Sequence, residues 1–196
     1  MRICVYGAAS PTIDDNYKEV TFNLGKLMVK RGHSLVFGGG GNGLMGAVAQ
    51  GVKSENGHII GVIPKFFDNE NIEAICDYCD QLIEPDTMRE RKQIMEDTAD
   101  AFIVVPGGIG TYEEFFEMLT LKQLGRHNKP MVMLNTRGYY DPMAAMLQNT
   151  VDEGFMSADC LELYGVCNSP EEALDYILNA KLVTGSIERK IEDYNK

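Results

Sequence analysis

Short apolar runs alternate along this chain with longer segments in which apolar residues return every three or four positions. The runs cover residues 3–6, 34–37, 58–63, 81–84, 101–105, 131–134 and 161–166. The segment 15–31 is typical of the rest, because Tyr17, Val20, Leu24 and Met28 fall at helical spacing. Strands that alternate with helices predict a parallel sheet covered by helices on both faces.

Turn residues divide the remaining chain into predicted helices over residues 47–56, 87–98, 111–124, 141–153 and 170–179, with a loop and a short helix within 65–80. We therefore predict one α/β domain, a doubly wound parallel sheet of Rossmann-like type, over residues 1–180. A charged tail, residues 181–196, follows it. In such a domain the ligand is expected outside the carboxyl ends of the strands.

Charge and hydropathy narrow the class of ligand. The 18 basic and 29 acidic residues give a formal charge of −11, which disfavours polymeric nucleic acid and favours a small phosphorylated ligand in a local cationic pocket. No apolar run approaches the roughly 18 residues of a membrane helix. The first apolar run reaches Gly7 too soon for a secretory signal, so we predict a cytoplasmic protein without membrane contact.

The five cysteines form no disulfide framework, since their number is odd and their spacing irregular. Cys76 and Cys79 form a single CxxC pair without a second one, which favours reduced structural thiols over a zinc or redox site. The three histidines form no ligand motif. We predict neither a metal site nor a cofactor.

Three glycine-containing turns, at residues 7–10, 38–46 and 106–111, follow predicted strands and so meet at one edge of the sheet. Glycines let a backbone approach a phosphate closely, and a helix N-terminus offers free N–H groups to it. The second turn matches GxGxxG but has neither the acid of a dinucleotide site nor the Lys-Ser/Thr of a P-loop. A mononucleotide site is favoured, and tight turns without a ligand are the alternative.

Arg91 lies on the apolar side of its predicted helix. At 100° per residue, Met88, Ile94 and Met95 define the apolar arc, Arg91 lies inside it and Lys92 at its margin. A buried arginine needs an anionic partner, because an unpaired buried charge is costly. A structural ion pair or a snorkelling side chain is the alternative to a ligand contact.

Glu114 has two interpretations that the sequence leaves open. Residues 111–114 match a capping box with Thr111 as the N-cap and Glu114 at the third helical position. The helical wheel also places Glu114 between Met118 and Leu121, on the apolar side opposite Arg91. The first interpretation makes Glu114 a helix cap, and the second makes it a catalytic acid.

The motifs Gly38-Gly-Gly-x-x-Gly-Leu-Met-Gly46, Met88-x-x-Arg-Lys92 and Pro-Gly-Gly-x-Gly-Thr-x-x-Glu114 resemble the signatures of the "lonely guy" phosphoribohydrolases. The resemblance extends to about residue 156. It implies cleavage of cytokinin riboside 5′-monophosphates, and often AMP, to free base and ribose 5-phosphate. It also implies a homodimer with the site near the interface, and members of this family have often been mislabelled lysine decarboxylases.

By this resemblance Arg91 and Glu114 are the catalytic pair, and no cofactor is implied. The implied substrate-binding residues come from the three turns and the two helices: Ser10, Gly39, Gly40, Gly43, Met88, Lys92, Gly107, Gly108, Ile109, Gly110, Thr111, Tyr112, Glu113 and Thr120. The chain departs from the family at 7–10, where Gly-Ala-Ala-Ser replaces Cys-Gly-Ser-Ser, and at Arg89, where many members have His. A further acid of the family aligns ambiguously with Glu70 or Glu73.

Hydrolysis of an N-glycosidic bond passes through an oxocarbenium-like transition state, which a fixed carboxylate stabilises while polarising the attacking water. We assign this role to Glu114, with Arg91 either orienting it or holding the nucleotide, and with Lys92 and the glycine turns fixing the 5′-phosphate. Two other functions stay open. One is a general nucleotide 5′-monophosphate nucleosidase, and the other is a non-catalytic carrier of a phosphorylated cofactor.

Overall fold

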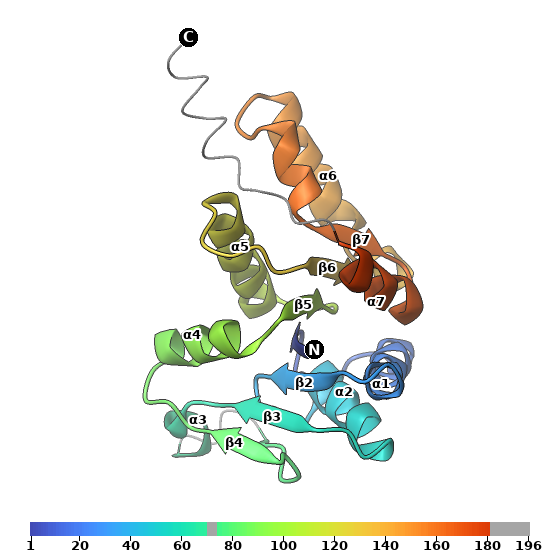
Figure 1. Ribbon diagram of the computed structural model, residues 1–196, viewed down its shortest axis with the longest axis vertical. Coiled ribbons are helices and arrows are strands. Elements are labelled where there is room, and N and C mark those ends of the chain that lie inside the picture. The colour runs from blue at the N-terminus through green and yellow to red at the C-terminus, as the bar shows by residue number, and fades with distance from the viewer. Residues whose placement is uncertain (70–73, 181–196) are drawn as a thin grey trace.

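A computed structural model describes residues 1–69 and 74–180. Within them lies a seven-stranded sheet whose neighbouring strands all pair in parallel, in the order β4-β3-β2-β1-β5-β6-β7 (Figure 1). The strands are β1 (Arg2–Tyr6), β2 (Ser34–Phe37), β3 (Ile59–Val62), β4 (Gln81–Ile83), β5 (Ala101–Val104), β6 (Met131–Leu134) and β7 (Gly165–Cys167). The predicted α/β class is confirmed.

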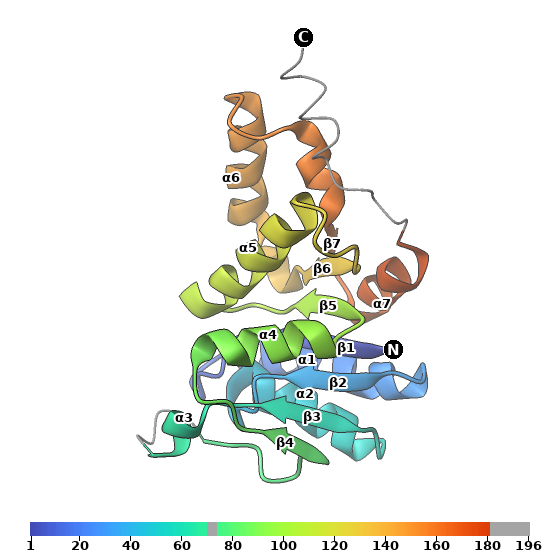
Figure 2. The same ribbon diagram turned by 60° about the vertical axis from the view of Figure 1, so that its left-hand side comes forward.

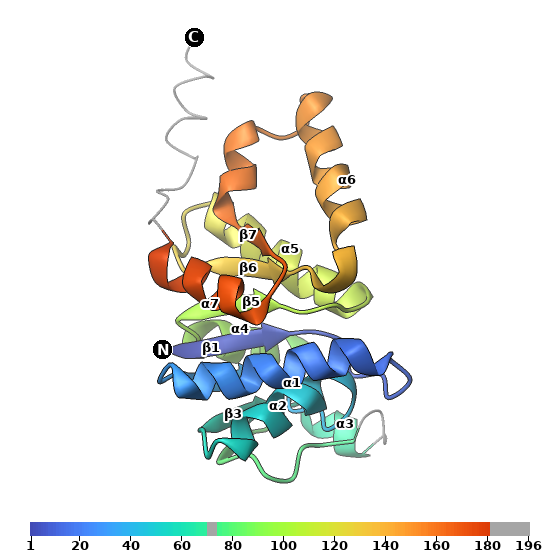
Figure 3. The ribbon, with the colours of Figure 1, turned by 90° about the vertical axis from the view of Figure 1, so that its right-hand side faces the viewer.

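Helices cover both faces of the sheet. On one face lie α1 (Asp15–Lys30), α2 (Gly43–Ser54) and α7 (Pro170–Asn179), which Figure 3 brings toward the viewer. On the other lie α4 (Met88–Thr98), α5 (Ile109–Gln123), α6 (Asp141–Asp152) and the 3₁₀ helix η2 (Ala158–Leu163); Figure 2 shows α4 and α5 in front of the sheet. The short helices α3 (Lys65–Asn69) and η1 (Thr136–Gly138) follow β3 and β6.

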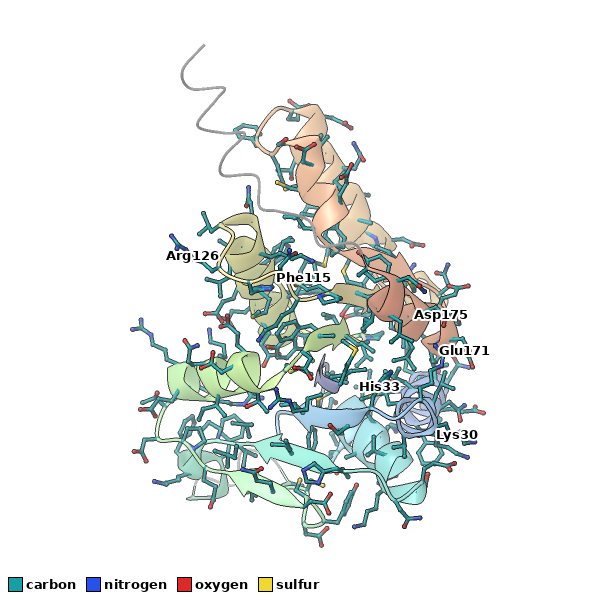
Figure 4. All side chains as sticks on the ribbon, in the orientation of Figure 1. Lys30, His33, Phe115, Arg126, Glu171 and Asp175 are labelled. Atoms are coloured by element: carbon teal, nitrogen blue, oxygen red, sulfur yellow. The ribbon has the colours of Figure 1, made fainter. Side chains whose placement is uncertain are left out.

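The alternation of side chains along each strand builds two cores, one under each layer of helices. In β1, Ile3 and Val5 face α1 and α2, whereas Cys4 and Tyr6 face α4 and α5. Phe115 of α5, labelled in Figure 4, belongs to the core between the sheet and the helices α4 and α5, and it is 1% exposed. On the opposite face, an ion pair of 2.5 Å between Arg31 and Asp175 joins the end of α1 to α7.

One predicted strand is wrong over part of its length. Residues 161–163, expected to begin the last strand, belong to η2, and β7 begins only at Gly165. Cys160 and Leu163 are the buried residues of η2 and lie three positions apart, which is the period of a 3₁₀ helix. An apolar run so short does not distinguish this period from that of a buried strand.

The strand order decides where a ligand can bind. The chain builds outward from β1 to β4 and then returns through α4 to β5, which pairs with β1 on its other side. The loops that follow β1, β2 and β5 therefore meet at the point where the direction of winding reverses, which is the usual ligand site of such sheets. These loops are the three glycine turns.

Some predictions fall outside the described residues, namely the charged tail 181–196 and the two alternative acids Glu70 and Glu73. Among the described residues, none of the helices combines the length and the apolar character that crossing a bilayer requires. The cytoplasmic location stays a prediction.

Candidate active site

Arg91 projects from α4 beneath the glycine turn that follows β2. Its Nη1 donates to Glu114 Oε1 at 3.1 Å, and its Nε donates to the carbonyl oxygen of Val62 at 3.1 Å. Its side chain is 13% exposed. A Cβ on Gly38 would lie 2.1 Å from Arg91 Nη2, so the guanidinium occupies this place only because residue 38 is glycine. The predicted burial of Arg91 is confirmed, with Glu114 as its anionic partner.

Glu114 reaches the same place from α5, where its side chain is 10% exposed. Burial raises the pKa of Glu114 from an ordinary value of 4.5 to about 7, and Arg91 limits this rise by its charge and its hydrogen bond. Near neutral pH the carboxyl group therefore exists in both protonation states. A group of this kind can accept and return a proton at physiological pH.

The capping box predicted at 111–114 is wrong. Helix α5 begins at Ile109, and its N-cap is Gly108, which offers no side chain to the helix. Thr111 lies two residues inside the helix and is buried; a Cβ on Gly107 would meet its Oγ1 at 2.1 Å. The first intrahelical bond runs from the N–H of Tyr112 to Gly108. The N–H groups of residues 109–111, in the first turn of the helix, have no partner within it and can hold an anion.

The turn after β2 needs glycine for two different reasons. Gly39 has φ +78° and Gly43 has φ +57°, a region of backbone conformation that other residues rarely adopt. A Cβ on Gly43 would also lie 2.6 Å from the backbone of Ala9, so this glycine lets the first two turns come together. Gly43 is also the first residue of α2.

Two cavities at this edge of the sheet border the Arg91–Glu114 pair or the third glycine turn, and another, of about 440 Å³, lies beside α1 and α2 with Gly41 and Gly43 in its wall. The smaller of the first two, of about 50 Å³, contains Arg91 and Glu114 in its wall together with Gly38, Gly40 and Tyr6. Since a water molecule occupies roughly 30 Å³ in the liquid, this volume suits one or two waters. The larger of these two, of about 320 Å³, lies between the other two turns and is bordered by Ala8, Ser10, Ile13, Asp14, Tyr17, Leu44, Pro106, Gly107, Gly108 and Tyr139.

Lys92, the next residue along α4, points away from the cavity that contains Arg91. Its Nζ forms ion pairs with Glu113 and with Glu117, the latter at 2.7 Å, on the outer side of α4 and α5. Although partial burial opposes it, hydrogen bonds to these two carboxylates raise the pKa of Lys92 above its ordinary value. Lys92 does not line the cavity that contains Arg91.

The predicted substrate residues thus divide into those at the cavities and those away from them. Gly40, Ser10, Gly107 and Gly108 line one cavity or the other. Met88, at the first position of α4, and Thr120, exposed in the last turn of α5, line neither.

Sequence reasoning missed several tyrosines at this edge. Tyr6 ends β1 and lines the small cavity, and Tyr17 and Tyr139 line the large one. The hydroxyl of Tyr139 donates to the carbonyl oxygen of Gly107 at 2.7 Å, which fixes the third turn. The position of residues 139–140 shortly after the predicted strand 131–134 was a usable signal, because every parallel strand ends at this edge.

No group of three or more His, Cys, Asp or Glu side chains suited to a metal ion occurs in the part of the chain that the structure describes.

Comparison with known proteins identifies a family over most of the chain. A family model described as "Possible lysine decarboxylase" matches residues 45–177. A cytokinin riboside 5′-monophosphate phosphoribohydrolase of Mycobacterium tuberculosis is 42% identical over 173 residues, covering 88% of this chain and 90% of that protein. A protein of the same name in Arabidopsis thaliana is 40% identical over 157 residues, covering 80% of this chain and 73% of that protein.

A solved structure shares the fold but less of the sequence. The molybdenum cofactor binding protein of Rippkaea orientalis matches with a TM-score of 0.68 and 24% identity, covering 90% of this chain and 94% of that one. Identity this low carries the fold alone. The matches at 40% and 42% identity show the family: the chain belongs to the "lonely guy" family of cytokinin riboside 5′-monophosphate phosphoribohydrolases, as its three motifs predicted.

Proposed function

We propose that this protein hydrolyses the N-glycosidic bond of cytokinin riboside 5′-monophosphates and of AMP, releasing the free base and ribose 5-phosphate. The observation that carries the proposal is the buried pair Arg91–Glu114 at the carboxyl edge of the sheet. It occurs in a chain that is 42% identical to the phosphoribohydrolase of M. tuberculosis.

Glu114 supplies the central chemistry. As the bond between ribose and base breaks, positive charge develops on the sugar, and a carboxylate at this position stabilises that charge. The same carboxylate takes a proton from the water that attacks the anomeric carbon, and the base leaves with the electrons of the broken bond and a proton. The pKa of about 7 supports this role, because the group then exchanges protons near neutral pH.

Arg91 acts on Glu114. Its 3.1 Å hydrogen bond holds Oε1, while the bond from Nε to Val62 fixes the guanidinium itself. The charge of Arg91 also lowers the pKa of Glu114, which maintains an ionised fraction in spite of burial. Arg91 therefore positions the carboxylate and tunes its basicity.

The 5′-phosphate is assigned to the N-terminus of α5. The free N–H groups of Ile109, Gly110 and Thr111 and the positive end of the helix dipole favour an anion there. Around Gly108 and Gly110 the space is open, since a Cβ on either would meet no atom within 4 Å. Lys92 lines neither cavity, and its proposed role is to add charge near the phosphate from its place beside Glu113 of α5. Binding energy from the phosphate would then hold the reacting carbon beside Glu114.

The proposal is tested by incubating the full chain with AMP, N6-isopentenyl-AMP, GMP, CMP and UMP, and by measuring free base and ribose 5-phosphate. We expect turnover of the two adenine nucleotides, with N6-isopentenyl-AMP preferred, and the same rates with a chelator present. Equal rates on all five nucleotides would instead indicate a general nucleosidase.

A carrier of a phosphorylated cofactor predicts a different result, namely tight binding of a nucleotide with no release of base. The similarity of fold to a molybdenum cofactor binding protein does not favour this function at 24% identity. Isothermal titration with AMP, run beside the activity assay, distinguishes the carrier from the hydrolase.

We also propose that the protein is a homodimer with the site near the interface. Ile109, in the first turn of α5, is 88% exposed, and Met88, in the first turn of α4, is 39% exposed. Apolar side chains this exposed beside a candidate site are suited to cover by a second subunit. Sedimentation equilibrium should give twice the chain mass, and Ile109→Glu should lower it toward the monomer.

A further inference from the structure

The CxxC pair Cys76 and Cys79 is not used by the proposed function, yet it lies directly behind the glycine turn. Both residues belong to the segment 74–80 that leads into β4, with a turn at residues 77–78 between them. Cys76 is 3% exposed, and Cys79 is partly exposed. All five cysteines of the chain are free thiols in this structure.

Backbone hydrogen bonds join this segment to the glycine turn. The N–H of Gly41 donates to Ala74 at 2.6 Å, the N–H of Cys76 donates to Gly39 at 2.8 Å, and Gly40 pairs with Ile75 in an antiparallel bridge. A displacement of Cys76 must therefore change the position of Gly39. Gly39 and Gly40 are predicted substrate residues, and Gly40 lines the cavity of the catalytic pair.

The two thiols contact one another. A hydrogen bond from Cys79 is the main cause that lowers the pKa of Cys76 below its ordinary value, although burial opposes it. The same contact, together with burial, raises the pKa of Cys79. The two cysteines thus share one proton, and the pair loses its first proton more readily than an isolated cysteine does. Burial instead raises the pKa of Cys4 and of Cys167.

We propose that Cys76 and Cys79 are a redox modification site, at which a low-molecular-weight disulfide such as oxidised glutathione forms a reversible disulfide bond that weakens nucleotide binding by the glycine turn. Intracellular disulfides of this kind are usually transient and redox-sensing. The effect on binding rests on the proposed function, whereas formation of the bond does not.

The reaction proceeds by two thiol–disulfide exchanges. The partly exposed Cys79 passes its proton to the thiolate of Cys76, attacks one sulfur of oxidised glutathione, and releases the first glutathione thiolate, which takes up that proton. The buried Cys76, as thiolate, then attacks the sulfur of Cys79 and releases the second. One disulfide of glutathione is reduced to two thiols, and the two protein thiols lose two protons and two electrons as their bond forms.

Bond formation must move the segment. The sulfurs come from a hydrogen-bonded contact to about 2.05 Å in a disulfide. The Sγ of Cys79 lies over Gly61 in β3, in the space that a Cβ at residue 61 would take. Bond formation draws the two sulfurs together from this position, and a shift of Cys76 reaches Gly39 through the hydrogen bond between them. We expect KM for AMP to rise at least about fivefold, the lower end of usual coupling between two sites. Because Arg91 and Glu114 come from other elements, kcat should change little.

The experiment treats the full chain with oxidised glutathione and then measures intact mass, peptide maps and AMP kinetics. We expect a mass lower by two hydrogen atoms, a bond mapped to Cys76–Cys79, a raised KM, and full reversal by dithiothreitol. Cys79→Ser should retain basal activity and lose sensitivity to the oxidant. Cys167→Ser is the matched control, since Cys167 is also partly exposed but lies in β7, and this variant should stay sensitive.

Two results would overturn the proposal: glutathione remaining attached to Cys79 without an internal bond, or an internal bond that leaves both KM and the affinity for AMP unchanged. Affinity is measured by isothermal titration in parallel. An internal bond that weakens AMP binding in a protein that releases no base would refute the hydrolase and support the redox site.

Discussion

Two basic residues of α4 that are adjacent in the sequence, Arg91 and Lys92, each form ion pairs with carboxylates of α5. Arg91 pairs with Glu114, and the two side chains are 13% and 10% exposed. Lys92 pairs with Glu113 and Glu117, whose side chains are 52% and 40% exposed. The Lys92 side chain is itself only 17% exposed, so the two contacts differ mainly in their carboxylates, which are inside the molecule in one and at its surface in the other.

The comparison shows what burial adds to a charge pair. One residue along a helix turns a side chain by 100°, which places Arg91 under the glycine turn and Lys92 outside it. The surface pair is stabilised little by its charges, because solvent screens them. The inner pair costs desolvation of both groups, and this cost raises the pKa of Glu114 to about 7. The inner pair thus has the proton chemistry that the surface pair lacks.

The largest difference between the pairs is expected in activity. Arg91→Met removes the group that orients Glu114 and favours its ionised form, so kcat/KM for AMP should fall roughly 10²–10³-fold, as when one fixed hydrogen-bond donor is lost from an active site. Arg89→Met is the control, since Arg89 is exposed on the opposite side of α4. Equal activity of the two variants would remove the distinction between the inner and outer cations.

A second variant moves Arg91 without replacing it. In Gly38→Ala the new Cβ would lie 2.1 Å from Nη2, and the flexible end of Arg91 can move away without unfolding the domain. Loss of the 3.1 Å contact should lower kcat/KM roughly 100-fold, the scale of a misplaced active-site group. Thermal melting should be nearly unchanged. In the Arg91→Met background the same substitution should cost almost nothing more, and additive losses would contradict this explanation.

The raised pKa of Glu114 predicts how stability depends on pH. The native state holds this proton up to about pH 7, whereas the unfolded chain releases it near 4.5. The native state therefore binds more protons between these values, and the contribution of Glu114 to the free energy of unfolding should fall by about 3 kcal/mol from pH 4.5 to pH 7. Urea denaturation at pH 5 and pH 8 should show a larger decrease for the natural protein than for Glu114→Gln. Equal decreases would mean that the carboxyl group ionises as it does in water.

The smallest effect is expected at the surface pair. Lys92→Met should lower the free energy of unfolding by no more than about 1 kcal/mol, because its partners are partly exposed. Urea denaturation at low and high salt measures this effect, which added salt should reduce. A loss of 3 kcal/mol or more, typical of a broken buried pair, would mean that the two contacts are equivalent.

The sequence was sufficient for the sheet and for the inner pair. The short apolar runs of β1, β2 and β5 and the period near 3.6 in α4 and α5 identified these elements, and the wheel placed Arg91 and Glu114 on facing apolar sides. These inferences succeeded because each depends on local periodicity. The location of both groups behind Gly38 was not predictable, since it depends on which strands are neighbours.

The errors have the same origin in tertiary packing. Thr111 reads as a helix cap, but Gly108 takes that position, and Thr111 packs against Gly107. Residues 161–163 read as a strand, yet their contact with the second core has the period of η2. Tyr6 and Tyr17 fall within a predicted strand and a predicted helix, and only the folded chain shows that they and Tyr139 border cavities.

The most direct test compares Glu114→Gln with Glu113→Gln in the release of adenine from AMP, with folding checked by circular dichroism. Both variants replace one carboxylate of α5 by an isosteric amide, and they differ in which pair is altered. We predict a loss of roughly 10²–10⁴-fold in kcat for Glu114→Gln, the range for a missing general base, and a change of less than about tenfold for Glu113→Gln. Near-normal release of adenine by Glu114→Gln would contradict the account.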